Sequence, residues 1–264
     1  MSTTTEQSLA ATPDELLENL KLKSGDPARV GWSIRLRQNA GYFAPAEHYE
    51  ALIAKLVTSE TDWLDVGSGH DLFPHNRRLA RTLADRCSRL VGLDPDPSIH
   101  ENPFVHEKVQ CPIEDFQPRE TFNLITLRMV AEHIANPGAA LAALARLARP
   151  AGRVVVYTVS KWSLTSLAAR AVPFGLHHPV KRLLWGTKEE DTFPVVYRMN
   201  TRRRIRTLFE AAGFREIAFQ TLADASLFWN FRLPHRLELA SWRMCRALKL
   251  PYPETCLLGT YRRL

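Results

Sequence analysis

The stretch at residues 63–71, WLDVGSGHD, predicts the fold of this chain. Its first four residues place three apolar side chains around one carboxylate, which is typical of the end of a buried strand, and Asp65 closes that strand. Gly67, Ser68 and Gly69 follow as a turn in which the backbone can approach a ligand without interference from a Cβ atom. The pattern therefore predicts a strand that leads into a ligand-binding turn.

A helix start is predicted directly after this turn. Asp71 is a suitable N-cap residue, and Pro74 is tolerated in the first turn of a helix that runs through Arg77–Arg86. A strand, a glycine turn and a helix N-terminus in this order make a nucleotide-type pocket. The Gly-x-Gly pattern alone is a weak signal, so the rest of the chain has to support it.

The residues of the turn exclude two common nucleotide sites. A dinucleotide site needs G-x-G-x-x-G, and a P-loop needs a lysine after its second glycine; neither is present here. Asp65 and Asp71 would also repel a pyrophosphate. An acidic turn with glycines instead favours a ligand that carries an ammonium group and no phosphate.

The segments after this helix continue the alternation of strand and helix. Arg89–Asp94 is a second apolar strand ending in a carboxylate, roughly 20 residues past the glycines, the spacing at which an acid binds ribose hydroxyls. Phe122–Met129 and Val154–Val159 are further strands, separated by a helix over Gly138–Ala148. The polar, turn-rich residues 97–108 are expected to form a loop. This order predicts an open α/β sheet.

Taken in order, these segments resemble a known family. The motifs are LDVGSG, VGLD, IED at Ile113–Asp115, FNLIT, AEHI and RPAGRVV, within residues 40–160. Together they resemble class I S-adenosylmethionine-dependent methyltransferases, most of all the small-molecule branch that includes the quinone-biosynthesis enzymes (methyltransferase type 11). The resemblance implies a Rossmann-like, doubly wound, seven-stranded α/β sheet, mostly parallel with an antiparallel last strand, plus helical lid insertions. It also implies S-adenosyl-L-methionine as cofactor and S-adenosyl-L-homocysteine as its product.

Length and composition fit one methyltransferase domain. With 264 residues, 45% of them apolar, the chain can bury a sizeable core. We expect a disordered polar tail at 1–12 and a single domain at 13–264. Its expected parts are an N-terminal cap (13–58), a cofactor-binding core (59–160), a lid insertion (161–199) and a C-terminal part of the sheet with a second insertion (200–264).

Charge, cysteines and hydrophobic runs restrict the partners and the location. The net charge of +7 permits an acidic partner, such as nucleic acid or an anionic membrane, without requiring one. The four cysteines lie far apart without a Cys-x-x-Cys pair, so we expect buried residues and no metal site. No apolar run is long enough to span a bilayer, and the first residues lack the features of a secretory signal. We therefore expect a cytoplasmic protein.

The resemblance assigns cofactor contacts to the ends of the strands. The expected contacts are Asp65, Gly67, Ser68 and Gly69 with the methionyl part, Asp94 with the ribose, and Pro95, Ile113 and Glu114 with the adenine. The chain departs from the family at Pro112 and Ile113, where a side-chain acceptor for the adenine amino group is usual. The backbone of Ile113 can still serve, and the amino group needs another acceptor, Glu114 or Asp115.

We expect three residues at the C-terminal end of the Phe122–Met129 strand, and just beyond it, to lie in the cleft. The reason is that ligands bind at the carboxyl ends of strands in open α/β sheets. We expect Arg128 to contact the cofactor and Met129 to contact the substrate. His133 is predicted to act as a base or to line the methyl-transfer site. A helix-start histidine that makes structural hydrogen bonds is an equal alternative.

The N-terminal segment is expected to cover the cofactor. In the family that this chain resembles, such a segment often does so, which implies contacts from Arg37 and Tyr42. A helix is predicted over Ala46–Val57, with its apolar residues at helical spacing. The alternative for Tyr42 is that it only packs this helix onto the sheet.

A segment between Lys161 and Arg198 lies outside the family pattern. Its apolar and aromatic residues are interleaved with arginine and lysine, which indicates an amphipathic helical lid, broken at Pro173, over the active-site mouth. A plain packed helical hairpin is the alternative. The composition of 161–186 also fits a peripheral contact with a membrane surface. The residues expected to contact the substrate here are His177, His178 and Tyr197.

The remaining segments complete the sheet. The expected elements are a helix over Thr201–Ala212, a sixth strand over Glu216–Thr221, a helix near Pro234–Leu248 and a last strand over Cys256–Tyr261 that pairs antiparallel with the sixth. The run Arg202–Arg204 is predicted to be a solvated helix face rather than a nucleic-acid site.

Three functions compete at this point, and the main prediction is methyl transfer to a small-molecule O, N or C acceptor, with lipophilic acceptors included. Such a transfer is an in-line displacement, so the protein needs mainly to align a nucleophile about 3–3.5 Å away in a dry site. An RNA or protein methyltransferase that uses the arginine face is the second hypothesis, against which the chain shows no appended RNA-binding module. A non-catalytic cofactor-binding protein is the third.

Overall fold

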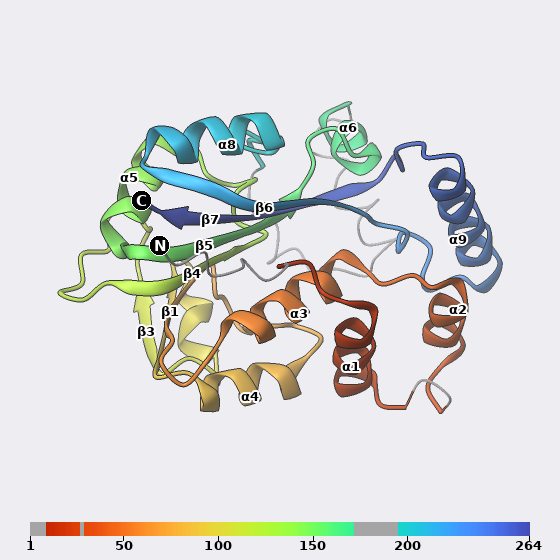
Figure 1. The fold of residues 1–264 in the computed structure, drawn as a ribbon, viewed down its shortest axis with the longest axis horizontal. Coiled ribbons are helices and arrows are strands. Elements are labelled where there is room, and N and C mark those ends of the chain that lie inside the picture. Colours follow the sequence, from red (N-terminus) through yellow and green to blue (C-terminus); the bar gives the residue numbers. More distant parts are fainter. Residues whose placement is uncertain (1–8, 27–28, 172–194) are drawn as a thin grey trace, which may run out of the picture.

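The computed structural model describes residues 9–26, 29–171 and 195–264. Its strands are β1 (Asp62–Val66), β2 (Arg89–Asp94), β3 (Glu107–Gln110), β4 (Phe122–Arg128), β5 (Ala148–Val159), β6 (Phe214–Ala223) and β7 (Thr255–Arg263). Within the described residues they form one seven-stranded sheet in the order β3-β2-β1-β4-β5-β7-β6 (Figure 1). β7 runs antiparallel to β5 and β6, whereas the other neighbouring pairs are parallel. The predicted fold, mostly parallel with an antiparallel last strand, is confirmed.

Helices cover both faces of this sheet, which explains why its central strands are apolar on both sides. The helices α5 (Pro137–Leu147) and α8 (Arg202–Ala211) lie on one face, and α3 (Pro45–Leu56) and α4 (Arg77–Arg86) lie on the other (Figure 1). Residues of β1 and β4 such as Trp63 are fully buried between these layers. Each face of the sheet therefore contributes to its own hydrophobic cluster.

A buried polar network fixes the N-terminal helices against α4. Asn76 donates from Nδ2 to Glu50 Oε2 over 2.8 Å and to Asn19 Oδ1 over 3.0 Å. Lys23 on α1 (Pro13–Ser24) forms an ion pair of 3.1 Å with Glu50. Because buried polar groups are costly unless they are paired, this network specifies how α1, α3 and α4 meet.

Two local expectations are wrong. The N-cap of α4 is Asn76, whose side chain accepts a hydrogen bond from the Leu79 N–H, whereas Asp71 lies in the preceding loop and pairs with Arg77. Residues 97–108 contain a 3-10 helix, η1 (Pro97–Glu101), and the first two residues of the edge strand β3 instead of a continuous loop. β3 pairs with β2 alone and is mostly polar and exposed, so no run of alternating apolar residues marks it in the sequence.

The end of the molecule at the carboxyl ends of the parallel strands carries three further helices. They are α2 (Trp32–Ala40), α6 (Leu164–Ala171) and α9 (Arg232–Ala247), and α2 packs against α9 (Figure 1). Leu239 and Trp242 on α9 pack around Tyr42, which follows α2. Among the helices that the structure describes, none is both long and apolar enough to cross a bilayer.

Candidate functional site

The turn after β1 depends on glycine at position 67. Gly67 has a φ of 71°, in the left-handed region, and its N–H donates to the Leu93 carbonyl at the end of β2 over 2.8 Å. A Cβ atom built there would lie 2.2 Å from Cγ2 of Val130. At Gly69, whose φ is 44°, the nearest atom would be the carboxylate Oδ2 of Asp94 at 3.9 Å. Without Cβ atoms at positions 67 and 69, the backbone of this turn stays accessible to a ligand at the edge of the sheet.

The carboxylate of Asp94 lies directly beside this turn. Its Oδ2 accepts from the Gly69 N–H, and its Oδ1 accepts from the Asp96 N–H, both over 2.9 Å. Asn102, after η1, donates from Nδ2 to the carbonyls of Ser68 and Gly69 over 3.2 and 3.1 Å. Hydrogen bonds thus connect the ends of β1 and β2. The structure brings together the predicted ribose-binding acid and the predicted glycine turn.

Asp65 is a buried carboxylate at the tip of β1. It accepts a hydrogen bond of 2.6 Å from Oγ1 of Thr126 on β4. Burial raises the pKa of the Asp65 carboxyl to about 6, and the hydrogen bond from Thr126 and the charge of Arg128 oppose that rise. A cationic group bound beside Asp65 would stabilise its ionised form.

Arg128 ends β4, the strand next to β1 in the sheet. Its guanidinium lies close enough to Asp65 to lower the pKa of that carboxyl. Burial raises the pKa values of Tyr49 and Tyr157, and the charge of Arg128 opposes this rise. The two tyrosine rings stack with 5.2 Å between their centroids. The charge of Arg128 thus acts on both Asp65 and the stacked tyrosines, at the sheet edge where ligands bind in this fold class.

Glu132 is a buried acid that the sequence prediction left out of the site. It accepts a hydrogen bond of 2.7 Å from Thr158 Oγ1, which in turn accepts one of 2.7 Å from Nδ2 of Asn200. Burial raises the pKa of Glu132. Its backbone carbonyl accepts from the N–H groups of Val196 and Tyr197. Glu132 therefore joins the segment after β4 to β5 and to the chain that returns from the predicted lid. The AEHI motif at 131–134 was the available signal for it.

Two predicted substrate residues near Glu132 have left-handed backbone. Met129 has a φ of 55° and donates from its N–H to the Tyr157 carbonyl over 2.7 Å, and Tyr197 has a φ of 49°. Such conformations are unfavourable for residues with a Cβ and are concentrated at functional sites. His133 is partly buried and its N–H donates to the Val130 carbonyl. Its role as a base stays a prediction.

The predicted adenine contacts lie at the neighbouring edge of the sheet. Asp94 and Gln110 are paired in the parallel register of β2 and β3, and Gln110 Nε2 donates to the Pro95 carbonyl over 3.4 Å. The Ile113 side chain is buried in the core, so its backbone is the part left for a ligand, and Glu114 is partly exposed. The structure therefore brings Pro95 against the end of β3, and an adenine contact from Pro95, Ile113 or Glu114 stays a prediction.

The two predicted N-terminal contacts are engaged inside the protein. The Tyr42 hydroxyl donates to the Ala223 carbonyl over 3.2 Å and accepts from the Ala225 N–H over 2.7 Å, and its ring meets that of Trp242. Arg37 forms an ion pair with Glu47. This geometry favours the packing alternative for Tyr42, although it packs onto the C-terminal part of the chain rather than only onto the sheet. A cofactor contact from either residue stays a prediction.

Other predicted residues lie outside the described part of the chain. His177, His178 and Pro173 fall within 172–194, as does most of the 161–186 segment for which a membrane contact was predicted. Within the described ranges, no group of three or more His, Cys, Asp or Glu side chains is arranged to hold a metal ion.

The residues present fit S-adenosylmethionine. Gly67 and Gly69 leave room for a ligand to approach the backbone, which a Cβ at position 67 would close. Asp65 suits an ammonium group, Arg128 a carboxylate and Asp94 a pair of ribose hydroxyls. This donor set follows the order of groups along the cofactor, from the amino acid to the nucleoside.

Comparison with known proteins agrees with this geometry. The family described as "Methyltransferase domain" matches residues 27–218. The ubiquinone biosynthesis O-methyltransferase of Rhodopseudomonas palustris strain HaA2 is 29% identical over 139 residues, covering 49% of this chain and 51% of that protein. This chain therefore spans about half the length of the curated relative.

Two solved structures are similar in fold. The N-methyltransferase NodS from Bradyrhizobium japonicum WM9 has a TM-score of 0.50 at 14% identity, covering 83% of this chain and 96% of that one. The [4+2]-cyclase SpnF has a TM-score of 0.51 at 14% identity, covering 96% and 97%. Their different reactions mean that the fold alone does not determine the chemistry. The match over residues 27–218, more than half of the chain, does determine the family. The chain belongs to the methyltransferase domain family, whose cofactor is S-adenosylmethionine.

Proposed function

We propose that this protein transfers the methyl group of S-adenosylmethionine to a small-molecule acceptor through an O, N or C nucleophile. The observation that carries the proposal is the meeting of Asp65, Arg128 and Asp94 at the carboxyl ends of three neighbouring strands. An ammonium group, a carboxylate and vicinal hydroxyls on one ligand match these three side chains. The family match over 27–218 supports the same assignment.

Each of these residues has a separate task in the proposed reaction. The bound cofactor would supply the reactive methyl carbon and its own leaving group. Asp65 and Arg128 hold the amino acid end, and Asp94 orients the ribose from the neighbouring strand. The buried, stacked rings of Tyr49 and Tyr157 lie near enough to Arg128 for its charge to act on both hydroxyls, and they keep the inner end of the site apolar. The protein therefore acts mainly by alignment in a dry site.

We further propose a hydroxyl acceptor of lipophilic type. The curated relative is named an O-methyltransferase of ubiquinone biosynthesis. A hydroxyl acceptor must lose its proton during transfer, and His133 is the candidate base because it directly follows the buried Glu132 near the tips of β4 and β5.

A cytosolic location is part of the proposal, because free buried thiols such as Cys87 and Cys256 fit a reducing compartment.

Titration calorimetry tests cofactor binding directly. We expect heat of binding from S-adenosylmethionine and from S-adenosylhomocysteine with the purified protein. The substitution Asp94→Asn should weaken both by about tenfold or more, because it removes the negative charge that binds the hydroxyls. Asp85→Asn, on the exposed side of α4, is the matched control and should leave both affinities unchanged.

Turnover is tested separately. Methyl transfer from labelled cofactor to a panel of catechols, phenols and amines should give product with at least one hydroxyl acceptor. The variant His133→Gln should have a lower kcat with little change in KM. Absence of binding heat from both cofactor forms would overturn the proposal. Binding without transfer to any acceptor would support a non-catalytic protein instead.

The arginine-rich helix gives no support to an RNA substrate. Arg202 pairs with Glu216 and Arg206 pairs with Glu210, each over 2.7 Å. These carboxylates compensate part of the positive charge of α8, so the helix is better explained as a solvated face.

A further inference from the structure

The outer face of α9 carries an exposed apolar stripe. Leu233, Leu237, Met244 and Leu248 are each more than half exposed. Their spacing of four, seven and four residues places them on one side of the helix. Trp229 and Phe231, in the loop before the helix, are about half exposed as well. Such a continuous apolar surface marks an interaction site rather than ordinary surface.

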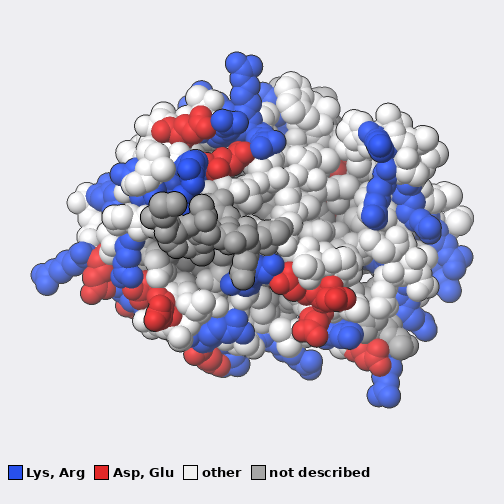
Figure 2. Space-filling model, in the orientation of Figure 1, with Lys and Arg blue, Asp and Glu red and all other residues white. Residues whose placement is uncertain are grey.

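Cations flank this stripe without exposed acids. Arginine or lysine stands at five exposed positions, Arg232, Arg236, Arg243, Arg246 and Lys249. The acid in residues 227–250, Glu238, is buried and accepts hydrogen bonds from the N–H groups of Leu227 and Phe228. Figure 2 shows blue and white atoms, and no red ones, over α9. The charge on this face is therefore positive and uncompensated within the segment.

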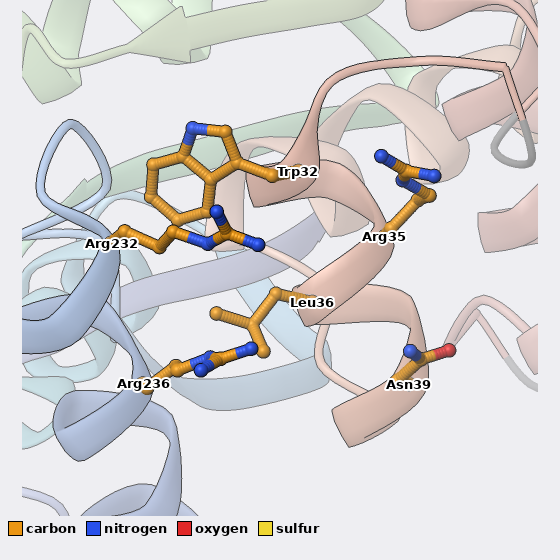
Figure 3. A pocket seen from close by; sticks show the side chains of 6 residues that line it. All are labelled: Trp32, Arg35, Leu36, Asn39, Arg232 and Arg236. Carbon is orange, nitrogen blue, oxygen red and sulfur yellow. The ribbon is translucent and has the colours of Figure 1, made fainter.

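A basic pocket adjoins the stripe where α9 meets α2. It has a volume of about 330 Å³ and is lined by Trp32, Arg35, Leu36, Asn39, Arg232 and Arg236. Figure 3 shows Arg232 and Arg236 reaching from α9 toward Trp32 and Leu36 on α2. None of the described residues that line the pocket is an acid. The guanidinium groups of Arg232 and Arg236 therefore border a space without a carboxylate, where they can bind a phosphate group (Figure 3).

The opposite face of α9 is fixed to the rest of the protein. Leu239 and Trp242 pack around Tyr42, and the ring of the buried His235 meets that of Trp32 on α2 with 6.3 Å between their centroids. The stripe is therefore held outward on a packed helix. It lies at the same end of the molecule as the carboxyl ends of the parallel strands (Figure 1).

We propose that α9, with the adjoining pocket, docks this protein onto an anionic phospholipid surface. The apolar stripe enters the boundary between headgroups and acyl chains, the flanking arginines contact anionic headgroups, and the pocket receives a lipid phosphate. An RNA partner would leave the leucines without a contact, and a second copy of this chain would bring like charges together. The inference rests on this surface alone, but a lipophilic acceptor for the proposed methyl transfer would reach the site from such a surface.

Vesicle co-sedimentation tests the proposal with the whole 264-residue chain. We expect it to pellet with vesicles of phosphatidylcholine mixed with phosphatidylserine and to remain in solution with phosphatidylcholine alone. The double substitution Arg232→Gln/Arg236→Gln should weaken binding by about tenfold or more, because two charges near the membrane are lost. Arg203→Gln/Arg204→Gln, on exposed positions of α8, removes the same charge and should change binding less than twofold by the same principle.

Apolar variants and competing partners complete the test. The double substitution Leu233→Ser/Leu237→Ser should also reduce vesicle binding, because the apolar side chains that enter the membrane are lost. Changing the salt concentration should not restore this binding. Cofactor calorimetry on the same variants should be unchanged, which shows that they are folded and separates this inference from the methyl-transfer proposal. Three results would overturn it: equal binding by the α9 and α8 variants, binding of soluble inorganic phosphate without vesicle binding, or a dimer that Leu237→Ser converts to a monomer.

Discussion

The backbone N–H of Gly69 donates to the carboxylate of Asp94 over 2.9 Å, which joins the turn after β1 to the tip of β2. The same carboxylate accepts from the Asp96 N–H. An acid that accepts two backbone hydrogen bonds is fixed in orientation before any ligand arrives, so its outer lone pairs point in a constant direction. Preorganisation of this kind reduces the ordering cost of binding.

The substitution Gly67→Ala should destabilise the protein by about 1–3 kcal/mol. The added Cβ would meet Val130 at 2.2 Å, and the left-handed backbone disfavours any Cβ. Urea unfolding measures the change, and cofactor affinity should fall with it. Combining it with Val130→Ala should restore part of the stability because the clash is then removed, whereas the backbone penalty remains. Gly138→Ala in α5, where the nearest atom to the added Cβ would be 3.5 Å away and alanine favours the helix, is the control and should not destabilise the protein.

Asp65 should make the stability of the ligand-free protein depend on pH. Its pKa is raised from 3.8 to about 6 by burial, so the folded state prefers the protonated acid. The Asp65 contribution to stability is therefore fully present below pH 3.8 and is lost as pH rises through 6. Asp65→Asn removes this loss, and its unfolding free energy relative to the original protein should rise by about 1–2 kcal/mol between pH 5 and pH 8. A difference that does not change with pH would contradict the assignment.

Cofactor affinity should show the opposite trend at the same residue. Binding of the ammonium group requires ionised Asp65, so affinity for S-adenosylhomocysteine should increase as pH rises from 5 to 7. Calorimetry at several pH values measures this. In Asp65→Asn the increase should disappear and affinity should be low throughout, whereas Asp85→Asn should behave like the original protein.

Glu132→Ala should cost more stability than Glu132→Gln. The Thr158 hydroxyl donates to this side chain while accepting from Asn200, and a glutamine oxygen can replace the acceptor. Alanine leaves the buried O–H donor of Thr158 without its acceptor, at a cost of about 1–3 kcal/mol, while the hydrogen bond from Asn200 remains. Chemical unfolding compares the two variants. Equal stability of the alanine and glutamine forms would mean that the hydrogen-bonded chain contributes nothing.

Tyr42→Phe distinguishes the two roles considered for Tyr42. The variant leaves the buried N–H of Ala225 without its acceptor, so we expect a loss of about 1–3 kcal/mol in unfolding free energy. If Tyr42 only joins α2 to the C-terminal part, cofactor affinity measured by calorimetry stays the same. A loss of affinity in the still-folded variant would show the direct contact instead.

Local sequence was enough to predict the central part of the fold and the residues that meet at its candidate site. The β1 strand, the glycine turn and the β2 carboxylate lie within residues 62–94, where turn chemistry and apolar periodicity act over a few residues. Parallel pairing of β1 and β2 then necessarily brings their carboxyl ends to one edge, so Asp65, Gly69 and Asp94 meet. The edge strand β3 and the Asn76 cap were missed because neither has an apolar pattern to mark it.

Only the tertiary structure decided the contacts between distant segments. Tyr42 meets Ala223 and Ala225 across more than 180 residues, and Glu132 meets Thr158, which in turn meets Asn200. The sequence of α9 indicates a helix, but both of its faces carry apolar residues. Packing against α2 and Tyr42 buries Leu239 and leaves Leu233 and Leu237 exposed. A sequence pattern determines which residues share a face, whereas the surface that covers this face depends on long-range packing.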